Sequence, residues 1–374
     1  MIELTFKAQF DTPSPPFVAK VRVHSGAQST NPSAQEALAA PAGDGTYRCR
    51  AIQGAFSLRV PPGDAIDGDV LLCVPTRKVA HRLFRRASRH NTLLLTERCD
   101  QLCLMCSQPP KHSDDDWRFP YFEQALSLCD TGTLVGISGG EPTLYLDSLI
   151  DMLSRASEKR PDLRFHILSN AQHFSREKIA RVRALHEPTD TTWGIPLYSH
   201  RPATHDEIVG KPGAFERLLE NIFLLGSVGA KIELRTVITA LNMLDLPHLA
   251  GFVAKTIPFI GHWAIMGMEP IGYARAQWDR LFFDHSIFSQ PLTNALEIAG
   301  LKGVPCHLYN VPRCTVPERY RNRCVDSISD WKKKYLPECA GCGERNACSG
   351  FFEWYSEKSR WARIAPIASY GGKS

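Results

Sequence analysis

The chain has 374 residues of ordinary globular composition, 43% hydrophobic and 22% charged, which is long enough for two or three domains with full cores. Its net charge of +5 is mild and does not by itself indicate a nucleic-acid partner. No apolar run approaches the ~18 residues of a membrane span, and the first ten residues lack the basic-then-apolar order of a signal peptide. We therefore expect a cytoplasmic protein that binds neither membrane nor nucleic acid.

Residues 1–88 are predicted to form a separate, mostly-β module without catalytic groups. An edge strand of such a module can accept an extended peptide. The stretch from Gly26 to Gly45 is Ser-, Ala- and Pro-rich and is expected to be a loose loop with one helical turn. Strand-like runs, separated by Pro- and Gly-rich turns, lie at Ile2–Phe10, Val18–His24, Tyr47–Ile52, Phe56–Val60 and Asp69–Val74.

The densest basic run of the chain is His81 to His90, with the sequence HRLFRRASRH. We interpret it as the solvated face of a short helix anchored by Leu83 and Phe84, in preference to a polyanion site.

Three cysteines follow an apolar run, Thr92–Thr96, that is predicted to be a buried strand. Cys99, Cys103 and Cys106 are spaced C-x-x-x-C-x-x-C. Three thiolates on a four-iron four-sulfur ([4Fe-4S]) cluster leave one iron without a protein ligand, where a cofactor can bind. The alternative is a structural zinc site, which usually has four N or S ligands. In a reducing compartment clustered cysteines favour metal binding over disulfides.

This spacing resembles that of the radical S-adenosylmethionine (SAM) enzymes. The resemblance implies that the open iron binds the amino and carboxylate groups of SAM. An electron from the cluster then cleaves SAM to a 5′-deoxyadenosyl radical, which abstracts hydrogen from a substrate. Relatives commonly carry an aromatic residue near the adenine before the last cysteine. Here that position is Met105, which is apolar and adaptable enough to fill the same place.

Strand and helix patterns alternate over residues 89–285, which indicates parallel βα units and an α/β class. Six strands are predicted, the number in the partial TIM-like (β/α)6 barrel of radical SAM enzymes, whose loops after the strands carry the chemistry. The strands are expected at Thr92–Thr96, Thr133–Ser138, Arg164–Leu168, Thr192–Leu197, Lys231–Ile238 and Trp263–Met268. The helices are expected at Tyr121–Cys129, Leu146–Glu158, Arg176–Leu185, Ala214–Leu225 and Leu246–Thr256.

The second predicted strand ends in SGGEPTL, residues 138–144. Gly139 and Gly140 allow the backbone to approach a ligand closely, and Glu141 supplies an acceptor for a cation. One βα unit after the cysteines, these residues with Pro142 match the glycine-rich motif of radical SAM enzymes, which holds the SAM amino group. Alone, the same four residues would be an ordinary strand-to-helix turn.

Later strand ends supply further candidates for SAM binding. Ser169 and Asn170 follow the third strand, where relatives carry a small polar residue and Asn. Arg235 in the fifth strand is able to meet the SAM carboxylate bidentately. An intra-barrel salt bridge of Arg235 with Glu233 or Glu269 is the alternative.

The end of the fourth strand departs from the family pattern. Pro196 stands where many relatives place a ribose-contacting Ser. Tyr198 or Ser199 is the substitute that the sequence offers.

Residues 286–374 are predicted to be a small Cys-rich domain with a second metal site. Cys314, Cys339, Cys342 and Cys348 make a four-ligand set suited to a structural zinc or to a cluster without an open iron. Downstream of a radical SAM barrel it resembles the auxiliary [4Fe-4S] domain of the SPASM or twitch type. Cys306 and Cys324 are reserve ligands.

Several segments together are similar to the radical SAM maturase of the His-Xaa-Ser system, the HxsC type, over most of residues 90–365. They are RCDQLCLMCSQPP, HDEIVGKPGAF, IPLYSH and YNVPRC with the later cysteines. The resemblance implies a precursor peptide with His-Xaa-Ser repeats as substrate and a second radical SAM maturase as partner. An electron donor such as flavodoxin or ferredoxin is also expected.

Two rival functions remain from the sequence. One is a radical SAM enzyme acting on a small molecule such as a cofactor precursor. The other is a non-enzymatic zinc protein, in which Gly-Gly-Glu-Pro would have no role. The sequence does not identify the residues that act on the substrate.

Overall fold

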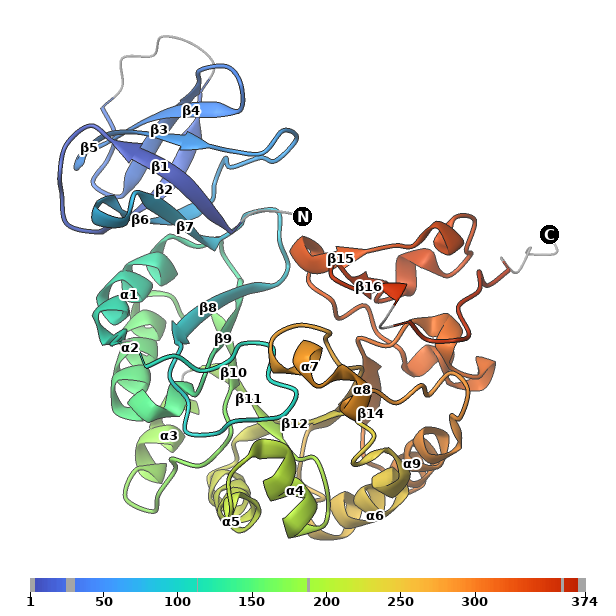
Figure 1. The fold of residues 1–374 in the computed structure, drawn as a ribbon. Coiled ribbons are helices and arrows are strands. Elements are labelled where there is room, and N and C mark those ends of the chain that lie inside the picture. Colours follow the sequence, from blue (N-terminus) through green and yellow to red (C-terminus); the bar gives the residue numbers. More distant parts are fainter. Residues whose placement is uncertain (1–3, 25–30, 113, 187–188, 358–359, 369–374) are drawn as a thin grey trace, which may run out of the picture.

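The computed structural model describes residues 4–24, 31–112, 114–186, 189–357 and 360–368. Figure 1 shows three parts: an N-terminal β-barrel, a central sheet with helices around it, and a C-terminal part with little regular structure. In the part of the chain that is described, no helix is long and apolar enough to cross a membrane.

The N-terminal part is a closed barrel with strand order β1-β5-β4-β3-β2-β6-β7. Its interior is filled by apolar side chains, among them Phe6, Phe17 and Phe56. Because β1 pairs with both β5 and β7, the barrel formed by the described residues has no free edge for an extended peptide, the docking mode that the sequence had left open. Ile2 and Glu3 of the first predicted strand lie outside the described residues. The strands are β1 (Thr5–Phe10), β2 (Phe17–Val23), β3 (Glu36–Pro41), β4 (Thr46–Ala51), β5 (Gly54–Arg59), β6 (Val70–Val74) and β7 (Val79–Phe84).

The loop expected from Gly26 to Gly45 contains a strand instead. Residues 25–30 lie outside the described part, but β3 pairs parallel with β2 and antiparallel with β4. Ala37 and Ala39 face the barrel interior and are fully buried. Small, helix-favouring residues therefore fit a strand here because the neighbouring strands supply the pairing.

The helix expected at the start of the basic run His81–His90 is also a strand, β7. Within it Arg82 is buried, and its guanidinium contacts Asp69 at 2.5 Å and Asp64 at 2.7 Å. A buried guanidinium is tolerated only with such partners, so this arginine is part of the barrel structure and not of a solvated face.

The central part is an α/β fold with an open, parallel sheet in the order β14-β13-β12-β11-β10-β9-β8, consistent with a partial TIM barrel. Helices surround its outer face in Figure 1. The strands are β8 (Asn91–Thr96), β9 (Leu134–Gly139), β10 (Arg164–Leu168), β11 (Asp190–Pro196), β12 (Lys231–Val237), β13 (His262–Met266) and β14 (Cys306–Tyr309). The helices are α1 (Phe119–Leu128), α2 (Leu146–Lys159), α3 (Ile179–His186), α4 (Pro202–Val209), α5 (Ala214–Ser227), α6 (Leu246–Thr256), α7 (Tyr273–Ala276), α8 (Trp278–Leu281) and α9 (Gln290–Leu301).

The sheet has seven strands where the sequence predicted six. The seventh unit is α9 and β14, which lie beyond residue 285. Leu292 of α9 and Leu308 of β14 are fully buried in the same core as the other strands. The predicted domain limits of 88 and 285 stay predictions.

The C-terminal part consists of short turns and one two-stranded pair, β15 (Lys333–Lys334) with β16 (Phe351–Phe352). It stands above the sheet beside the N-terminal barrel in Figure 1. Asp330 joins the two, since it pairs with Arg85 at 2.6 Å and accepts a 3.1 Å hydrogen bond from Ser88 Oγ.

Candidate active site

A cavity of about 1410 Å³ lies between the three parts of the chain. The inner faces of the central strands form its walls, and residues from the N-terminal barrel and the C-terminal part complete them. Of the residues predicted from the sequence, those that line it are Cys99, Cys103, Cys106, Gly139, Gly140, Ser169, Asn170 and Arg235. Those that do not line it are Glu141, Pro142 and Ser199.

The cysteine loop, residues 97–118 between β8 and α1, is held by main-chain hydrogen bonds. The N–H groups of Leu102 and Leu104 donate to the last carbonyls of α4, at 3.1 and 2.9 Å. The Cys106 carbonyl accepts from Tyr273 N–H at 2.9 Å. Gly272 (φ 61°) comes so near that a Cβ on it would lie 2.4 Å from the Cys106 oxygen. The backbone that presents the three sulfurs is thus fixed from two sides.

The three sulfurs of this loop lie close enough to influence one another. Burial raises the pKa of Cys99 to about 12, and burial followed by the charges of Cys106 and Cys99 raises that of Cys103. Burial also raises the pKa of Cys106. Three such thiols bind a cation as thiolates by releasing their protons.

Met105, the residue before the last cysteine, is buried and lines the cavity. It packs in an apolar cluster with Met268 and Trp278. The apolar surface expected at this position is therefore present beside the cysteines.

Asp100, inside the cysteine motif, is a site residue that the sequence analysis missed. Its carboxylate accepts a 2.8 Å hydrogen bond from Asn170 Nδ2, contacts Lys211 Nζ and lies 3.3 Å from His173 Nε2. Burial alone would raise the pKa of Asp100, but His173 and Lys211 hold it well below its ordinary value. The signal was present: Asp100 is the one acidic residue between the first two cysteines.

Gly139 and Gly140 make their close approach to the cysteine loop. A Cβ on Gly139 (φ 148°) would lie 2.1 Å from Thr96 O, and one on Gly140 would lie 2.1 Å from Arg98 O. Gly140 N–H also donates to Thr96 O at 2.8 Å. The two glycines therefore join the second strand end to the cysteine loop while they line the cavity.

Glu141 is fully buried and is directed into the protein. Its Oε1 accepts from Thr143 N and Ser169 Oγ, both at 2.8 Å, and its Oε2 accepts from Asn170 N at 2.5 Å. Asn170 is thus held by Glu141 through its main chain and by Asp100 through its side chain. The carboxylate braces residues that face the cavity, and Pro142 behind it is buried.

Arg235 lines the cavity and is ion-paired with Glu233, one of the two partners left open by the sequence. The other, Glu269, pairs with Lys332 at 3.1 Å. Burial alone would raise the pKa of Glu233, but nearby His166 and Arg235 lower it to about 2. The guanidinium therefore lies in the cavity wall beside a carboxylate whose charged form it stabilises.

At the end of β11, Pro196 and Tyr198 line the cavity and Ser199 does not. Ser199 Oγ accepts from Arg201 N at 3.0 Å at the start of α4. Tyr198 stacks on His205 with ring centroids 5.7 Å apart. Of the two substitutes predicted for the ribose contact, Tyr198 is the one that faces the cavity.

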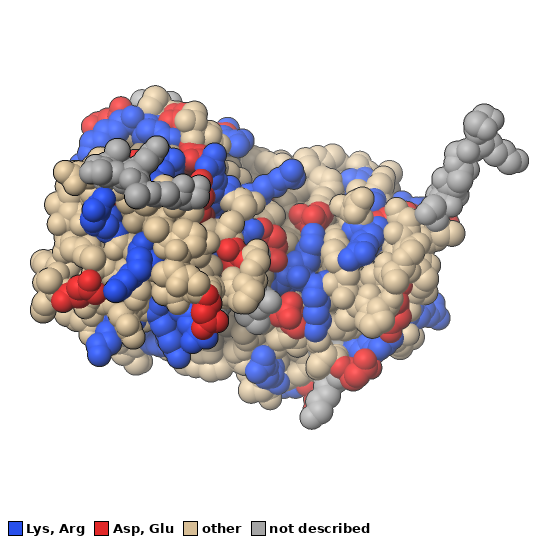
Figure 2. All heavy atoms as spheres, turned by 90° about the horizontal axis from the view of Figure 1, so that it is seen from above, with Lys and Arg blue, Asp and Glu red and all other residues tan. Residues whose placement is uncertain are grey.

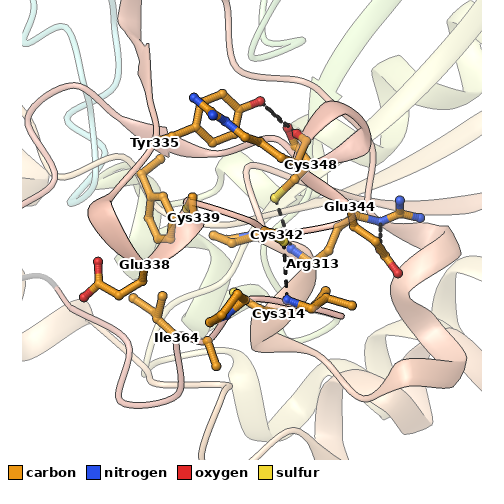
Figure 3. Close-up of a pocket in the computed structure, with 15 residues that line it drawn as sticks. Arg313, Cys314, Tyr335, Glu338, Cys339, Cys342, Glu344, Cys348 and Ile364 are labelled. Carbon is orange, nitrogen blue, oxygen red and sulfur yellow. Dashed lines mark hydrogen bonds and ion pairs between the residues drawn. The ribbon is translucent and has the colours of Figure 1, made fainter. Parts of the chain in front are cut away.

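The four C-terminal cysteines surround one small space, as Figure 3 shows. They come from separate turns: Cys314 from residues 313–315, Cys339 from 337–339, and Cys342 and Cys348 from the loop before β16. Phe351 and Ile364 add apolar walls.

Main-chain N–H groups point at two of these sulfurs. Arg313 N and Gly350 N donate to Cys348 Sγ, and Ile367 N donates to Cys342 Sγ, all at 3.4 Å. Such donors stabilise sulfur as thiolate and are usual around iron–sulfur clusters. The four-sulfur donor set with its N–H groups fits a thiolate-bound metal centre. Among the described residues no three His, Cys, Asp or Glu side chains converge on one ion position.

The two reserve cysteines are buried and line neither space. Cys306 lies in β14 within the main core. Burial raises the pKa of Cys324 to about 12, and the charges of Cys348 and Cys314 add to this effect. Cys324 therefore lies nearer the second site than Cys306 does.

Residues 93–252 match the family model described as the radical SAM superfamily. No curated protein sequence matches the chain. Similar solved structures include Streptococcus suis SuiB bound to S-adenosylmethionine, with 18% identity and a TM-score of 0.46 over 58% of this chain and 49% of that one. They also include anSMEcpe with bound AdoMet and the Cp18Cys peptide, at 13% identity and a TM-score of 0.41 over 58% and 62%. A third is a radical SAM methyltransferase from Sphaerobacter thermophilus, at 12% identity and 0.41 over 70% and 72%. The chain spans about half the length of SuiB.

Proposed function

We propose that this chain, which carries a radical SAM superfamily domain at residues 93–252, reductively cleaves SAM and uses the resulting radical to modify a ribosomally made peptide. The observation that carries the proposal is the meeting of the cysteine loop and the glycine-rich strand end at one cavity inside the matched domain. When bound, the cluster supplies an electron and SAM supplies the radical that abstracts hydrogen.

Cys99, Cys103 and Cys106 would hold the cluster. Three sulfur donors on a loop fixed by main-chain bonds fit a cluster with one open iron. Asp100 binds Asn170 and Lys211 and so attaches the cysteine loop to the segments that follow β10 and α4, which helps to position the three sulfurs.

SAM would occupy the space beside the cysteines. Gly139, Gly140, Ser169 and Asn170 line it, and Arg235 provides a guanidinium for a carboxylate. Glu141 with Pro142 and Ser199 stay part of the proposed SAM site, in which Glu141 acts by holding Ser169 and Asn170. Tyr198 is added as a cavity-facing residue.

The size of the cavity supports a peptide substrate over a small molecule. Ordinary small-molecule pockets have volumes of about 300–1,000 Å³. This one has about 1410 Å³ and is bounded by all three parts of the chain, so bound SAM would leave room for a second, extended molecule. We take the His-Xaa-Ser system as the peptide class, with a second radical SAM maturase and a flavodoxin or ferredoxin as partners.

The four C-terminal cysteines would hold an auxiliary [4Fe-4S] cluster. Four protein ligands leave no open iron, so this cluster would not bind SAM. It would transfer electrons or stabilise the C-terminal part, which has little regular structure.

The reaction is tested with protein purified without oxygen. Incubation with SAM and dithionite should yield 5′-deoxyadenosine, and a peptide with His-Xaa-Ser repeats should change mass while a peptide of scrambled order should not. Product from a small molecule but from neither peptide would replace the peptide proposal by the cofactor-precursor alternative.

The second site is tested by replacing Cys342 and Cys348 with Ala. Iron should fall to roughly four atoms per chain from roughly eight for two four-iron clusters. Wild-type protein with about one zinc and only four irons would make this part a zinc module.

A further inference from the structure

The described residues before Asn91 contribute no acidic side chain to the cavity. Every ionisable side chain before Asn91 that lines the cavity is Arg or His. These side chains are Arg77, His81, Arg82, Arg85, Arg89 and His90. We call all of them except Arg82 the basic wall, because Arg82 is neutralised within the barrel by Asp64 and Asp69.

Two arginines of the basic wall are exposed and have no ion-pair partner in the described ranges, Arg77 and Arg89. Arg77 and Arg118 both lie over the ring of Trp117, each 5.8 Å from its centroid. Burial and then the charges of Arg118 and Arg77 lower the pKa of His81, which places this part of the wall in a positive field.

Arg85 supplies a second, independent feature of the basic wall. Its Nη2 pairs with Asp330, but its Nη1 is buried without a hydrogen-bond partner. A buried guanidinium N–H without an acceptor is costly, so the Arg85 side chain would gain a hydrogen bond by turning toward a ligand carboxylate in the cavity.

The acidic groups of the cavity are, in contrast, all paired. Their partners lie 2.6–3.1 Å away in most cases, so these charges cancel locally and leave Arg77 and Arg89 of the basic wall unbalanced. The pairs are Glu97 with Lys111, Asp190 with Lys231, Glu233 with Arg235, Glu269 with Lys332 and Asp326 with Lys333. Figure 2 shows that on the face seen from above Lys and Arg side chains are interspersed with Asp and Glu.

We propose that the basic wall binds an acidic segment of the substrate peptide, with Asp or Glu carboxylates, and so holds the peptide across the cavity. This rests on the proposed peptide substrate. A continuous polyanion such as nucleic acid fits less well, because the two arginines of the basic wall that are not ion-paired within the described residues, Arg77 and Arg89, would neutralise few of its phosphates.

The test measures binding of a short fluorescein-labelled peptide with Glu at alternate positions by fluorescence anisotropy. The full chain is purified without oxygen, and the same peptide with Gln in place of Glu is the comparison. The Glu peptide should bind about tenfold more tightly, and this advantage should shrink as salt is raised.

The double variant Arg77→Gln with Arg89→Gln should lose about tenfold in affinity for the Glu peptide. Its control is Arg48→Gln with Arg59→Gln, which removes the same charge from β4 and β5 at side chains 67% and 75% exposed. Neither control residue lines the cavity.

Equal binding of the Glu and Gln peptides, or an equal loss in both double variants, would overturn the proposal. So would a single-stranded oligonucleotide that binds more tightly than the Glu peptide and loses affinity in the Arg77/Arg89 variant. Formation of 5′-deoxyadenosine without peptide is measured in the same samples. If no 5′-deoxyadenosine forms but the chain still binds the Glu peptide more tightly than the Gln peptide, the proposed SAM cleavage is wrong and the proposed site for acidic peptides stands.

Discussion

Asn170 is the residue at which the two motifs of the site meet. Glu141 from the glycine-rich strand end binds its main-chain N–H, and Asp100 from the cysteine motif binds its side chain. Both carboxylates are largely removed from water, so their hydrogen bonds within the protein keep them in place. At this scale the motifs act as one hydrogen-bonded unit.

Replacing Glu141 with Gln should destabilise the protein by about 1–3 kcal/mol. The Gln side chain has an NH2 group in place of one carboxylate oxygen. Each Glu141 oxygen accepts a main-chain N–H, from Thr143 or from Asn170, so one of these buried donors would lose its acceptor. Urea unfolding of the variant measures the loss, and Glu158→Gln on the exposed face of α2 is the control. Weaker SAM binding without any loss of stability would instead mark Glu141 as a direct SAM ligand.

Residue types and spacing selected residues that the fold brings to one cavity. Three cysteines, two glycines, Ser169, Asn170 and Arg235 line the same cavity. Spacing could not predict the direction of a side chain, so Glu141 was expected at the ligand, and the choice between Tyr198 and Ser199 was left open. Asp100 and Lys211 were missed because their contact joins positions that are far apart in the chain.

Among the elements, the contact between the end of β9 and the cysteine loop depends on the absence of side chains. Gly139 approaches the main-chain oxygen of Thr96 at the end of β8, and Gly140 approaches that of Arg98 in the loop, both more closely than any Cβ allows. The geometry of the three sulfurs is therefore coupled to the second strand.

Gly140→Ala should displace the cysteine loop and lower the iron bound at the first site by up to about four atoms per chain. The added Cβ would lie 2.1 Å from Arg98 O, and either the strand end or the loop must move. Gly251→Ala in α6 is the control, because its Cβ would meet nothing within 4 Å. Full iron content in the Gly140 variant would show that the contact is not required.

Element positions in the central sheet followed from periodicity, and the α/β alternation with six strands is present. The elements that were missed lack a local signal. β14 has only four residues, β3 is half Ala, and β7 contains two basic residues. In each case pairing with neighbouring strands, which a local pattern does not contain, decides the structure.

For the whole molecule, the cavity depends on how the N-terminal and C-terminal parts stand above the sheet. Sequence patterns predicted these two parts as separate domains. They did not predict that both parts border the cavity. Asp330 ties them together through Arg85 and Ser88.

Asp330→Asn should loosen this connection by up to about 1 kcal/mol, because the pair is partly exposed. Amide hydrogen exchange over residues 85–91 should become faster, while SAM cleavage without peptide stays unchanged. Asp326→Asn, which breaks an ion pair inside the C-terminal part at similar exposure, is the matched control. Equal exchange in both variants would contradict the bridging role.

The central claim is that Cys99, Cys103 and Cys106 hold the cluster that cleaves SAM. Its most direct test is the amount of 5′-deoxyadenosine formed from SAM and dithionite by the variant with all three changed to Ala. We expect no product and about four fewer irons per chain, because no sulfur remains at this site to hold the cluster. The two sulfurs that a single variant keeps would also be too few. Product formation equal to that of the unchanged protein would contradict it.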